Sequence, residues 1–172
     1  MPLARPAAIK RVRLQRLRRM LEPVIRRVMH FYWRFSRGAT LGTRAMVING
    51  AGRVFLVKHS YIDGWHLPGG GVETGETLHE ALKRELMEEG RIELAGEATL
   101  FGIYLNSHVS RRDHVALYVV RHFAQDRKPE PNREIIDCDF FDLRALPPDT
   151  TVGTRLRIAE VTENKPQIPT WR

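Results

Sequence analysis

Three glutamates in the middle of the chain have the residue type and spacing of a metal site. Glu85, Glu88 and Glu89 stand at positions i, i+3 and i+4, so on a helix their carboxylates converge on one patch. Carboxylate oxygens suit Mg²⁺ or Mn²⁺, ions that also bind substrate phosphates. The cluster therefore indicates metal-assisted chemistry on a phosphate ester. The alternative is a solvated helix face whose glutamates pair with Lys83 and Arg84.

The helix that would carry these glutamates begins at a recognisable cap. Thr77 is followed three residues later by Glu80, which is a capping box in which each side chain satisfies a backbone N–H of the other residue. Apolar residues then recur at helical spacing and form a stripe that can lie against a sheet: Leu78, Ala81, Leu82 and Leu86.

A glycine-rich turn precedes the helix. Residues 65–73 read Trp-His-Leu-Pro-Gly-Gly-Gly-Val-Glu. Without a Cβ, the backbone of the three glycines can approach a ligand closely. This turn shifts the interpretation from a solvated helix face toward a ligand site.

The stretch from Gly70 to Ile92 resembles the signature of the Nudix hydrolases, G-x5-E-x7-R-E-U-x-E-E-x-G-U, where U is a bulky apolar residue. The matching positions are Gly70, Glu76, Arg84, Glu85, Leu86, Glu88, Glu89 and Ile92. One fixed position departs, because Arg91 replaces the last glycine and Gly90 comes one residue earlier. We therefore predict that the helix ends with Gly90 as its left-handed cap.

The resemblance implies an α/β (α+β) fold, the Nudix α-β-α sandwich, in which a mixed β-sheet lies between helices. It implies hydrolysis of the diphosphate bond in a nucleoside diphosphate linked to another moiety X. Water would attack phosphorus with the help of Mg²⁺ or Mn²⁺. The implied metal ligands are Glu85, Glu88, Glu89 and the carbonyl of Gly69.

Three other positions of the signature are expected to hold the metal ligands in place. Arg84 is expected to orient a glutamate through a bidentate hydrogen bond, and Glu76 is its natural partner. Gly70 belongs to the turn that delivers the site.

A further carboxylate is expected from a loop late in the chain. Glu134 lies just before a predicted strand, where it can act as a general base or a metal ligand. Its alternative is a surface charge paired with Arg133 or Lys128. Asp137 and Asp139 compete for the role, but they lie inside the strand, where ion pairs are the favoured use.

Several classes of substrate are compatible with the sequence. Residues able to line a pocket, each with core or rim as its alternative, are Arg44, Tyr61, Trp65, His66, Phe101, Asn106, His114 and Tyr118. The candidates for substrate binding are Arg44, Tyr61, Trp65, His66 and His114. Sugar nucleotides, dinucleoside polyphosphates, nucleoside triphosphates and capped RNA ends all fit. A catalytically silent nucleotide sensor is the alternative function, which three intact glutamates disfavour.

Positive charge is concentrated at the start of the chain. The formal net charge is +8, but residues 1–37 hold eleven Lys or Arg against one Glu, so the remainder is net negative. Apolar residues of this arm follow helical spacing: Leu17, Met20, Leu21, Val24, Val28, Phe31, Tyr32 and Phe35. Pro23 favours a break, so we predict two helices, about 8–21 and 23–36.

Several roles fit this basic, amphipathic arm. It could lie on an anionic membrane, contact RNA, or resemble a transit peptide. Packing on its own domain or on a second subunit, as in a homodimer, is the alternative.

The 172 residues, 42% of them hydrophobic, fit one domain with appendages. We predict a basic helical arm (1–37), a Nudix hydrolase domain (38–165) and an extended tail (166–172). Cys138 is the only cysteine, which excludes an internal disulfide, and its setting indicates a strand residue more than a nucleophile. Without a long apolar run, neither secretion nor membrane spanning is expected. The expected location is cytoplasmic, with a peripheral membrane position open.

Strands and helices outside the central helix follow from local composition. Strands are predicted at 43–48, 53–58, 65–67, 92–107, 114–121 and 135–141, and a last helix at 154–163. The Asn49–Gly52 turn predicts a hairpin between the first two strands.

Overall fold

The computed structural model describes residues 21–29, 31, 32 and 38–172. The chain divides into two compact units, residues 1–38 and 39–172. Each unit is described by itself.

The central helix of the second unit, α2 (Leu78–Gly90), begins as predicted. Thr77 is its N-cap, and its hydroxyl accepts a hydrogen bond from the backbone N–H of Glu80. The Glu80 carboxylate in turn accepts from the N–H of Thr77 at 2.8 Å. Both halves of the capping box are therefore present.

The predicted end of α2 is wrong. Gly90 is helical, and Arg91 adopts the left-handed conformation with φ of 51°. A Cβ added at Gly90 would lie 2.9 Å from the ring of Phe55. The glycine is therefore needed for close packing, and the helix runs through it. Arg91 is held by a bidentate pair with Asp126, at 3.1 and 2.8 Å.

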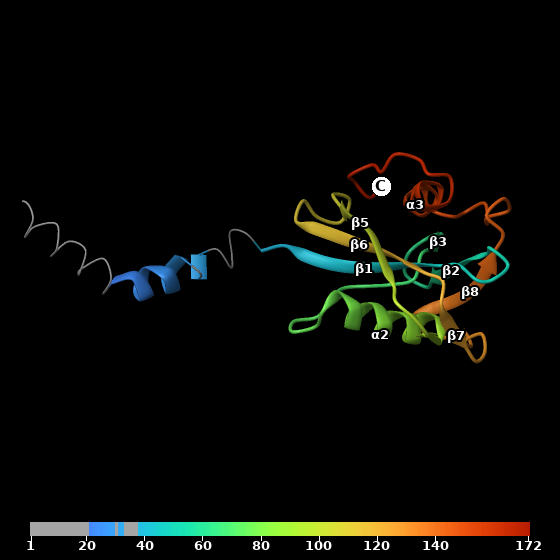
Figure 1. Ribbon diagram of the computed structural model, residues 1–172, viewed down its shortest axis with the longest axis horizontal. Helices are drawn as coiled ribbons and strands as arrows, with labels where there is room; N and C mark the ends of the chain where they lie inside the picture. Colours follow the sequence, from blue (N-terminus) through green and yellow to red (C-terminus); the bar gives the residue numbers. More distant parts are fainter. Residues whose placement is uncertain (1–20, 30, 33–37) are drawn as a thin grey trace, which may run out of the picture. The chain divides into compact units, whose positions relative to one another are not determined.

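The strands of residues 38–172 form three small sheets (Figure 1). The first has the order β1-β6-β5, with β1 parallel to β6 and β6 antiparallel to β5. The second has the antiparallel order β3-β2-β8, and the third pairs β4 with β7. The bounds are β1 Thr40–Val47, β2 Val54–His59, β3 Trp65–His66, β4 Ile92–Leu94, β5 Thr99–Leu105, β6 Asp113–Val120, β7 Phe123–Gln125 and β8 Ile135–Phe141.

The predicted hairpin between the first two strands is wrong. Only one bridge, between Ile48 and Val54, joins them. β1 pairs with β6 and β2 pairs with β8, so the two strands enter different sheets. The predicted strand 92–107 is likewise two strands, because the chain bends at 95–98 and β4 and β5 take different partners.

The sheets lie between α2 and a last helix, α3 (Val152–Thr162), on opposite sides of the strands in Figure 1. Alternating residues of β1 and Ile48, which follows it, face two separate cores. Ala45 and Val47 pack with Leu82 and Leu86 of α2. Met46 and Ile48 pack in the second core, which includes Ile158 of α3. The predicted α-β-α sandwich with mixed pairing is confirmed.

The last residues, 166–172, form neither a helix nor a strand and pack on the domain. The N–H of Trp171 donates to the carbonyl of Leu105 at 2.9 Å. The buried Glu160 carboxylate accepts from the N–H of Ile168 at 2.9 Å and from the guanidinium of Arg157 at 2.6 Å. Residues 166–172 therefore belong to the same compact unit as the domain.

Cys138 lies in β8 and is buried in the first core. Burial raises the pKa of its thiol to about 11. A thiol of this kind is a poor nucleophile, in agreement with the predicted strand role.

In the first unit, residues 21–29, 31 and 32 are helical. The predicted break at Glu22–Pro23 is wrong, because both residues lie within helix 21–29. The fixed φ of proline is itself helical, so the backbone can continue through it. The rest of the two predicted arm helices lies outside the described residues.

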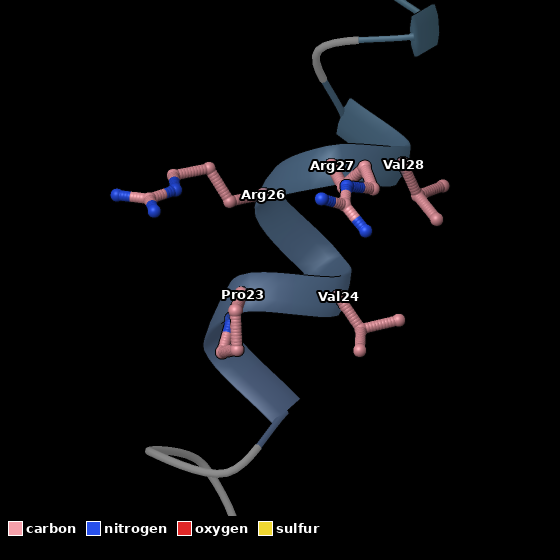
Figure 2. A pocket seen from close by; sticks show the side chains of 5 residues that line it. All are labelled: Pro23, Val24, Arg26, Arg27 and Val28. Carbon is pink, nitrogen blue, oxygen red and sulfur yellow. The ribbon is translucent and has the colours of Figure 1, made fainter.

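The described part of the arm has apolar and basic side chains on its surface. Figure 2 shows Val24 and Val28 on one side of the helix and Arg26 on the other. Among the described residues, no helix combines the length and the apolar character that crossing a membrane requires.

Candidate functional site

The glycine turn lies between β1 and α2 and is tied to both. The carbonyl of Gly70 accepts a hydrogen bond from the N–H of Thr43 at 2.9 Å. Gly69 has φ of 134°, and a Cβ there would collide with the Thr43 carbonyl. A Cβ on Gly70 would collide with the carboxylate of Glu85. Gly69 is therefore required for the turn to pass this closely, and a side chain at Gly70 would displace the Glu85 carboxylate.

Glu89 is the most deeply placed of the three helix glutamates. The residue is 4% exposed, and its Oε2 accepts a hydrogen bond of 2.6 Å from the N–H of Gly69. Burial raises the pKa of its carboxyl group to about 8, although the positive charge of Arg44 acts to lower this pKa. A buried carboxylate of this kind is stabilised by a bound cation.

Arg84 makes the bidentate pair expected of it. Its Nε and Nη2 donate to the two carboxylate oxygens of Glu76, both at 3.0 Å. Its Nη1 donates to Glu85 at 2.7 Å, and its Nη2 donates to the carbonyl of Gly71 at 3.0 Å. These hydrogen bonds hold the pKa of Glu76 below its usual range, whereas burial raises the pKa of Glu85. Arg84 thus fixes the helix and the glycine turn to each other.

The three helix glutamates differ in exposure. The Glu88 side chain is 61% exposed and lies 3.6 Å from Arg84, while the Glu85 side chain is 13% exposed. Glu89 is buried, so the exposure of the three side chains increases in the order Glu89, Glu85, Glu88. A site of this shape can hold an ion at the surface while shielding one side of it from water.

Glu134 comes close to the helix glutamates from a distant part of the sequence. The ligand atoms of His59, Glu89 and Glu134 lie within 4.8 Å of one another. The pairing of His59 with Ile135 between β2 and β8 brings Glu134 to this place. The Tyr61 hydroxyl donates to Glu134 at 3.2 Å.

The competing aspartates of β8 make the ion pairs predicted for them. Lys128 lies 3.0 Å from Asp137 and 3.5 Å from Asp139. Lys128, one of the two alternative partners considered for Glu134, is thus engaged with the strand.

His59 is a site residue that sequence reasoning missed. The predicted strand 53–58 stops one residue before it, but His59 is the last residue of β2 and is 5% exposed. Burial lowers the pKa of its imidazole to about 4, so the ring is neutral at pH 7. A polar residue at the end of the apolar run 54–57 was the available signal.

Three of the predicted substrate residues lie near this group. Arg44 acts electrostatically on both Glu89 and His59, and its Nη1 donates to the carbonyl of Leu67 at 2.8 Å. Tyr61 bonds Glu134, as described above. The ring of His66 lies 5.8 Å from that of His59.

The other predicted residues are placed elsewhere. Trp65 is 7% exposed and packs in the second core against Phe141, with ring centroids 4.7 Å apart. Phe101 packs against this same core, whereas Tyr118 is buried in the first core. His114 lies at the start of β6, opposite Leu41.

A cavity of about 560 Å³ opens beside the glycine turn. Its lining comes from the start of β1, the glycine turn, and the β5–β6 region: Ala39, Thr40, Leu41, Gly42, Thr43, Arg44, Gly70, Gly71, Val72, Thr74, Asn106, Val109, Asp113 and Val115. Asp113 accepts hydrogen bonds from Thr40 at 2.6 Å and Asn106 at 2.7 Å. The volume falls within the range of small-molecule sites.

Curated relatives match the middle of the chain. An ADP-ribose pyrophosphatase of Methanocaldococcus jannaschii is 35% identical over 81 residues, covering 47% of each chain. An RNA pyrophosphohydrolase of Legionella pneumophila is 38% identical over 64 residues, 34% of this chain and 37% of the relative. A Bacillus subtilis protein, provisionally named 8-oxo-dGTP diphosphatase, is 34% identical over 76 residues, 44% of this chain and 50% of the relative. The chain spans half or less of the length of these relatives.

Solved structures match most of the second unit. A MutT Nudix hydrolase from Burkholderia pseudomallei superposes with a TM-score of 0.62 at 28% identity, covering 73% of this chain and 99% of that chain. An ADP-ribose pyrophosphatase from Streptococcus suis superposes with a TM-score of 0.57 at 21% identity, over 76% of this chain and 97% of that chain. The second likeness supports the fold alone. The NUDIX domain family matches residues 39–161, and the chain belongs to the Nudix (MutT-like) hydrolase family.

Proposed function

We propose that this protein hydrolyses the diphosphate bond of a nucleoside diphosphate linked to another moiety X, using Mg²⁺ or Mn²⁺. The observation that carries the proposal is the approach of Glu134 to Glu89, which places carboxylates from two distant segments at one site. Family membership supports the same reaction class.

The donor chemistry of the site fits a divalent ion. Glu85, Glu88, Glu89 and the carbonyl of Gly69 would hold it, and all are hard oxygen donors. When bound, such an ion neutralises charge on the phosphate oxygens and lowers the pKa of the attacking water. The pKa of Glu89 is raised because burial disfavours the charged form of its carboxyl group. A bound cation would favour that charged form.

Side chains of the protein would accept the proton, orient the glutamates and attract the substrate. Glu134 would accept the proton of the attacking water, because its side chain is exposed and its Oε1 accepts a hydrogen bond from Tyr61. Arg84 holds Glu76 and Glu85 in fixed orientation. Arg44 lines the cavity and acts electrostatically on Glu89, so its positive charge would attract the diphosphate.

The substrate is proposed only as a class. The relatives are named for ADP-ribose, 8-oxo-dGTP and RNA ends, and a diphosphate bond is what these compounds share. The polar groups of Thr40, Asn106 and Asp113 at the cavity wall are suited to hydrogen bonding a base or sugar.

Turnover of a substrate panel tests the reaction. The full chain should hydrolyse at least one compound among ADP-ribose, dinucleoside polyphosphates, nucleoside triphosphates and triphosphorylated RNA, and only with Mg²⁺ or Mn²⁺ present. Glu88→Gln should lower kcat by orders of magnitude without unfolding, because the side chain is 61% exposed. The control Glu93→Gln changes an exposed glutamate outside α2. Nucleotide binding without turnover would point to the silent sensor instead.

We further propose that the arm binds an anionic membrane surface. Its described helix exposes apolar side chains at helical spacing, including Leu21 (45%), Val24 (58%) and Val28 (61%). The arm as a whole holds eleven basic residues against one acidic residue. Apolar burial combined with attraction to anionic lipid is the way such helices bind.

Vesicle binding tests the arm. The full chain should co-float with phosphatidylglycerol vesicles, less at high salt, and not with phosphatidylcholine vesicles. Combined Val24→Ser and Val28→Ser substitutions should weaken this binding and leave hydrolysis unchanged. Salt-sensitive RNA binding, or a dimer lost in the same variant, with no vesicle binding, would contradict the membrane role.

A further inference from the structure

We propose that His59 gives the metal site a nitrogen ligand, so that the site prefers first-row transition ions over Mg²⁺. This inference rests on the proposed metal-dependent function and goes beyond the oxygen donors assigned so far. Imidazole nitrogen adds affinity for ions such as Co²⁺ and Zn²⁺, whereas Mg²⁺ prefers oxygen ligands alone.

The position of His59 is the first argument. Its Nε2 lies 3.5 Å from Oε1 of Glu89. Two donors this far apart can both lie about 2.1 Å from one ion. The opposite Glu89 oxygen already accepts the N–H of Gly69, so Oε1 is the oxygen that faces the imidazole.

The third donor of the group lies at the surface. The ligand atoms of His59, Glu89 and Glu134 span up to 4.8 Å, slightly more than two bonds of about 2.1 Å. His59 and Glu89 are buried, but Glu134 is exposed. His59 and Glu89 therefore supply the direct ligands, and Glu134 lies beside them as the proposed proton acceptor.

The second argument is an unsatisfied nitrogen. The His59 side chain is 4% exposed, and its Nδ1 is buried with no hydrogen-bond partner in the part of the chain that the structure describes. No described hydrogen bond at Nδ1 therefore fixes the tautomer of the ring, and the proton can lie on Nδ1. The lone pair is then on Nε2, the nitrogen that faces Glu89, where a metal ion can be bound.

Two other rings lie beside the imidazole of His59. The His59 ring lies 5.2 Å from that of Tyr61 and 5.8 Å from that of His66. His66 makes its own contact, with Nε2 3.0 Å from the carbonyl of Asp63, and it is outside the three-residue group. It is therefore a matched control for a histidine in the same surroundings.

Electron paramagnetic resonance on the full chain tests the ligand directly. With substoichiometric Mn²⁺ and no substrate, pulsed measurements should detect ¹⁴N coupling from a bound imidazole. The coupling should vanish in His59→Gln and persist in His66→Gln. Absence of ¹⁴N coupling in the unsubstituted protein with Mn²⁺ bound would overturn the inference, and this result does not depend on how any variant folds.

Competition for the Mn²⁺ signal tests the selectivity. Co²⁺ should displace Mn²⁺ at much lower concentration than Mg²⁺ does. His59→Gln should weaken Co²⁺ binding by at least about tenfold and leave Mg²⁺ binding unchanged, whereas His66→Gln should change neither. Equal loss for both ions, or no loss, would contradict the inference.

These readouts separate the inference from the proposed function. ¹⁴N coupling in a protein that hydrolyses nothing would sustain the ligand and refute the reaction. Metal-dependent hydrolysis without ¹⁴N coupling would sustain the reaction and refute the ligand.

Discussion

The N–H of Gly69 donates a hydrogen bond of 2.6 Å to Oε2 of Glu89. This bond joins the glycine turn to the last turn of α2, twenty residues later. It occupies one carboxylate oxygen and leaves the other directed toward His59. The orientation of the most buried acidic group is thus set by backbone, and the backbone position in turn requires glycine at 69.

Arg84→Lys should lower kcat at least about tenfold, or roughly 1.4 kcal/mol in the barrier, while the protein stays folded. A lysine keeps the charge but cannot reproduce the bidentate bonds to Glu76 or bond Glu85 and Gly71 at the same time. Steady-state kinetics at saturating metal measures the effect.

The control for this change is Arg91→Lys. Arg91 also makes a bidentate pair, with Asp126, but outside the site. Its replacement should leave kcat unchanged. Equal effects of the two substitutions would mean that Arg84 stabilises the fold and does not orient the site.

Glu134→Gln should lower kcat at least about tenfold, since it removes the proposed proton acceptor without changing its shape. Tyr61→Phe should have a smaller effect in the same direction, because it removes one hydrogen bond to Glu134. The control Glu130→Gln alters an exposed carboxylate of the same loop. Unchanged rates for Glu134→Gln at saturating metal would assign catalysis to α2 alone.

Features fixed by neighbouring residues were predicted well. The start of α2 depends on Thr77 and Glu80, three residues apart, and the sequence contains both halves of the interaction. The Arg84–Glu76 pair is likewise encoded by spacing within one motif. Such signals are local and do not depend on how the sheet pairs.

Features fixed by distant pairing were missed. The turn at Asn49–Gly52 is locally suited to a hairpin, but β1 and β2 each have a partner from the second half of the chain. The same β2–β8 pairing places His59 beside Glu134. No local pattern around residue 59 specifies that neighbour, so the predicted strand stops at residue 58.

Gly90→Ala should destabilise the protein. The added methyl group would overlap with Phe55 and Ile92, and overpacking of this kind costs about 1–3 kcal/mol. The better helix propensity of alanine offsets up to about 1 kcal/mol of that cost. Denaturant unfolding should therefore show a lower free energy of unfolding.

The matched control is Gly50→Ala, at a turn position where an added Cβ meets no atom within 4 Å. It should leave stability nearly unchanged. A stabilising Gly90→Ala would mean that the packing against Phe55 relaxes easily and that helix propensity dominates.

The stability of the metal-free protein should fall between pH 6.5 and 8 because of Glu89. Burial raises the pKa of this carboxyl group from 4.5 to about 8 in the folded state, so its contribution is complete below pH 4.5 and is lost as the pH rises to 8. His59 acts oppositely, because burial lowers its pKa from 6.5 to about 4 and its contribution is complete only above pH 6.5. Below pH 6.5 the two groups change the stability in opposite directions. Above pH 6.5, Glu89 is the one of these two groups that still changes it.

Within that window the unfolded chain has released the Glu89 proton and the folded chain has kept it. The free energy of unfolding should therefore fall by about 1.4 kcal/mol per pH unit from this group. Glu89→Gln removes the titration, so denaturant unfolding with a chelator present should give a shallower slope in this variant than in the unsubstituted protein. The exposed control Glu93→Gln should keep the original slope. Identical slopes for all three proteins would show that Glu89 is already ionised at neutral pH in the folded chain.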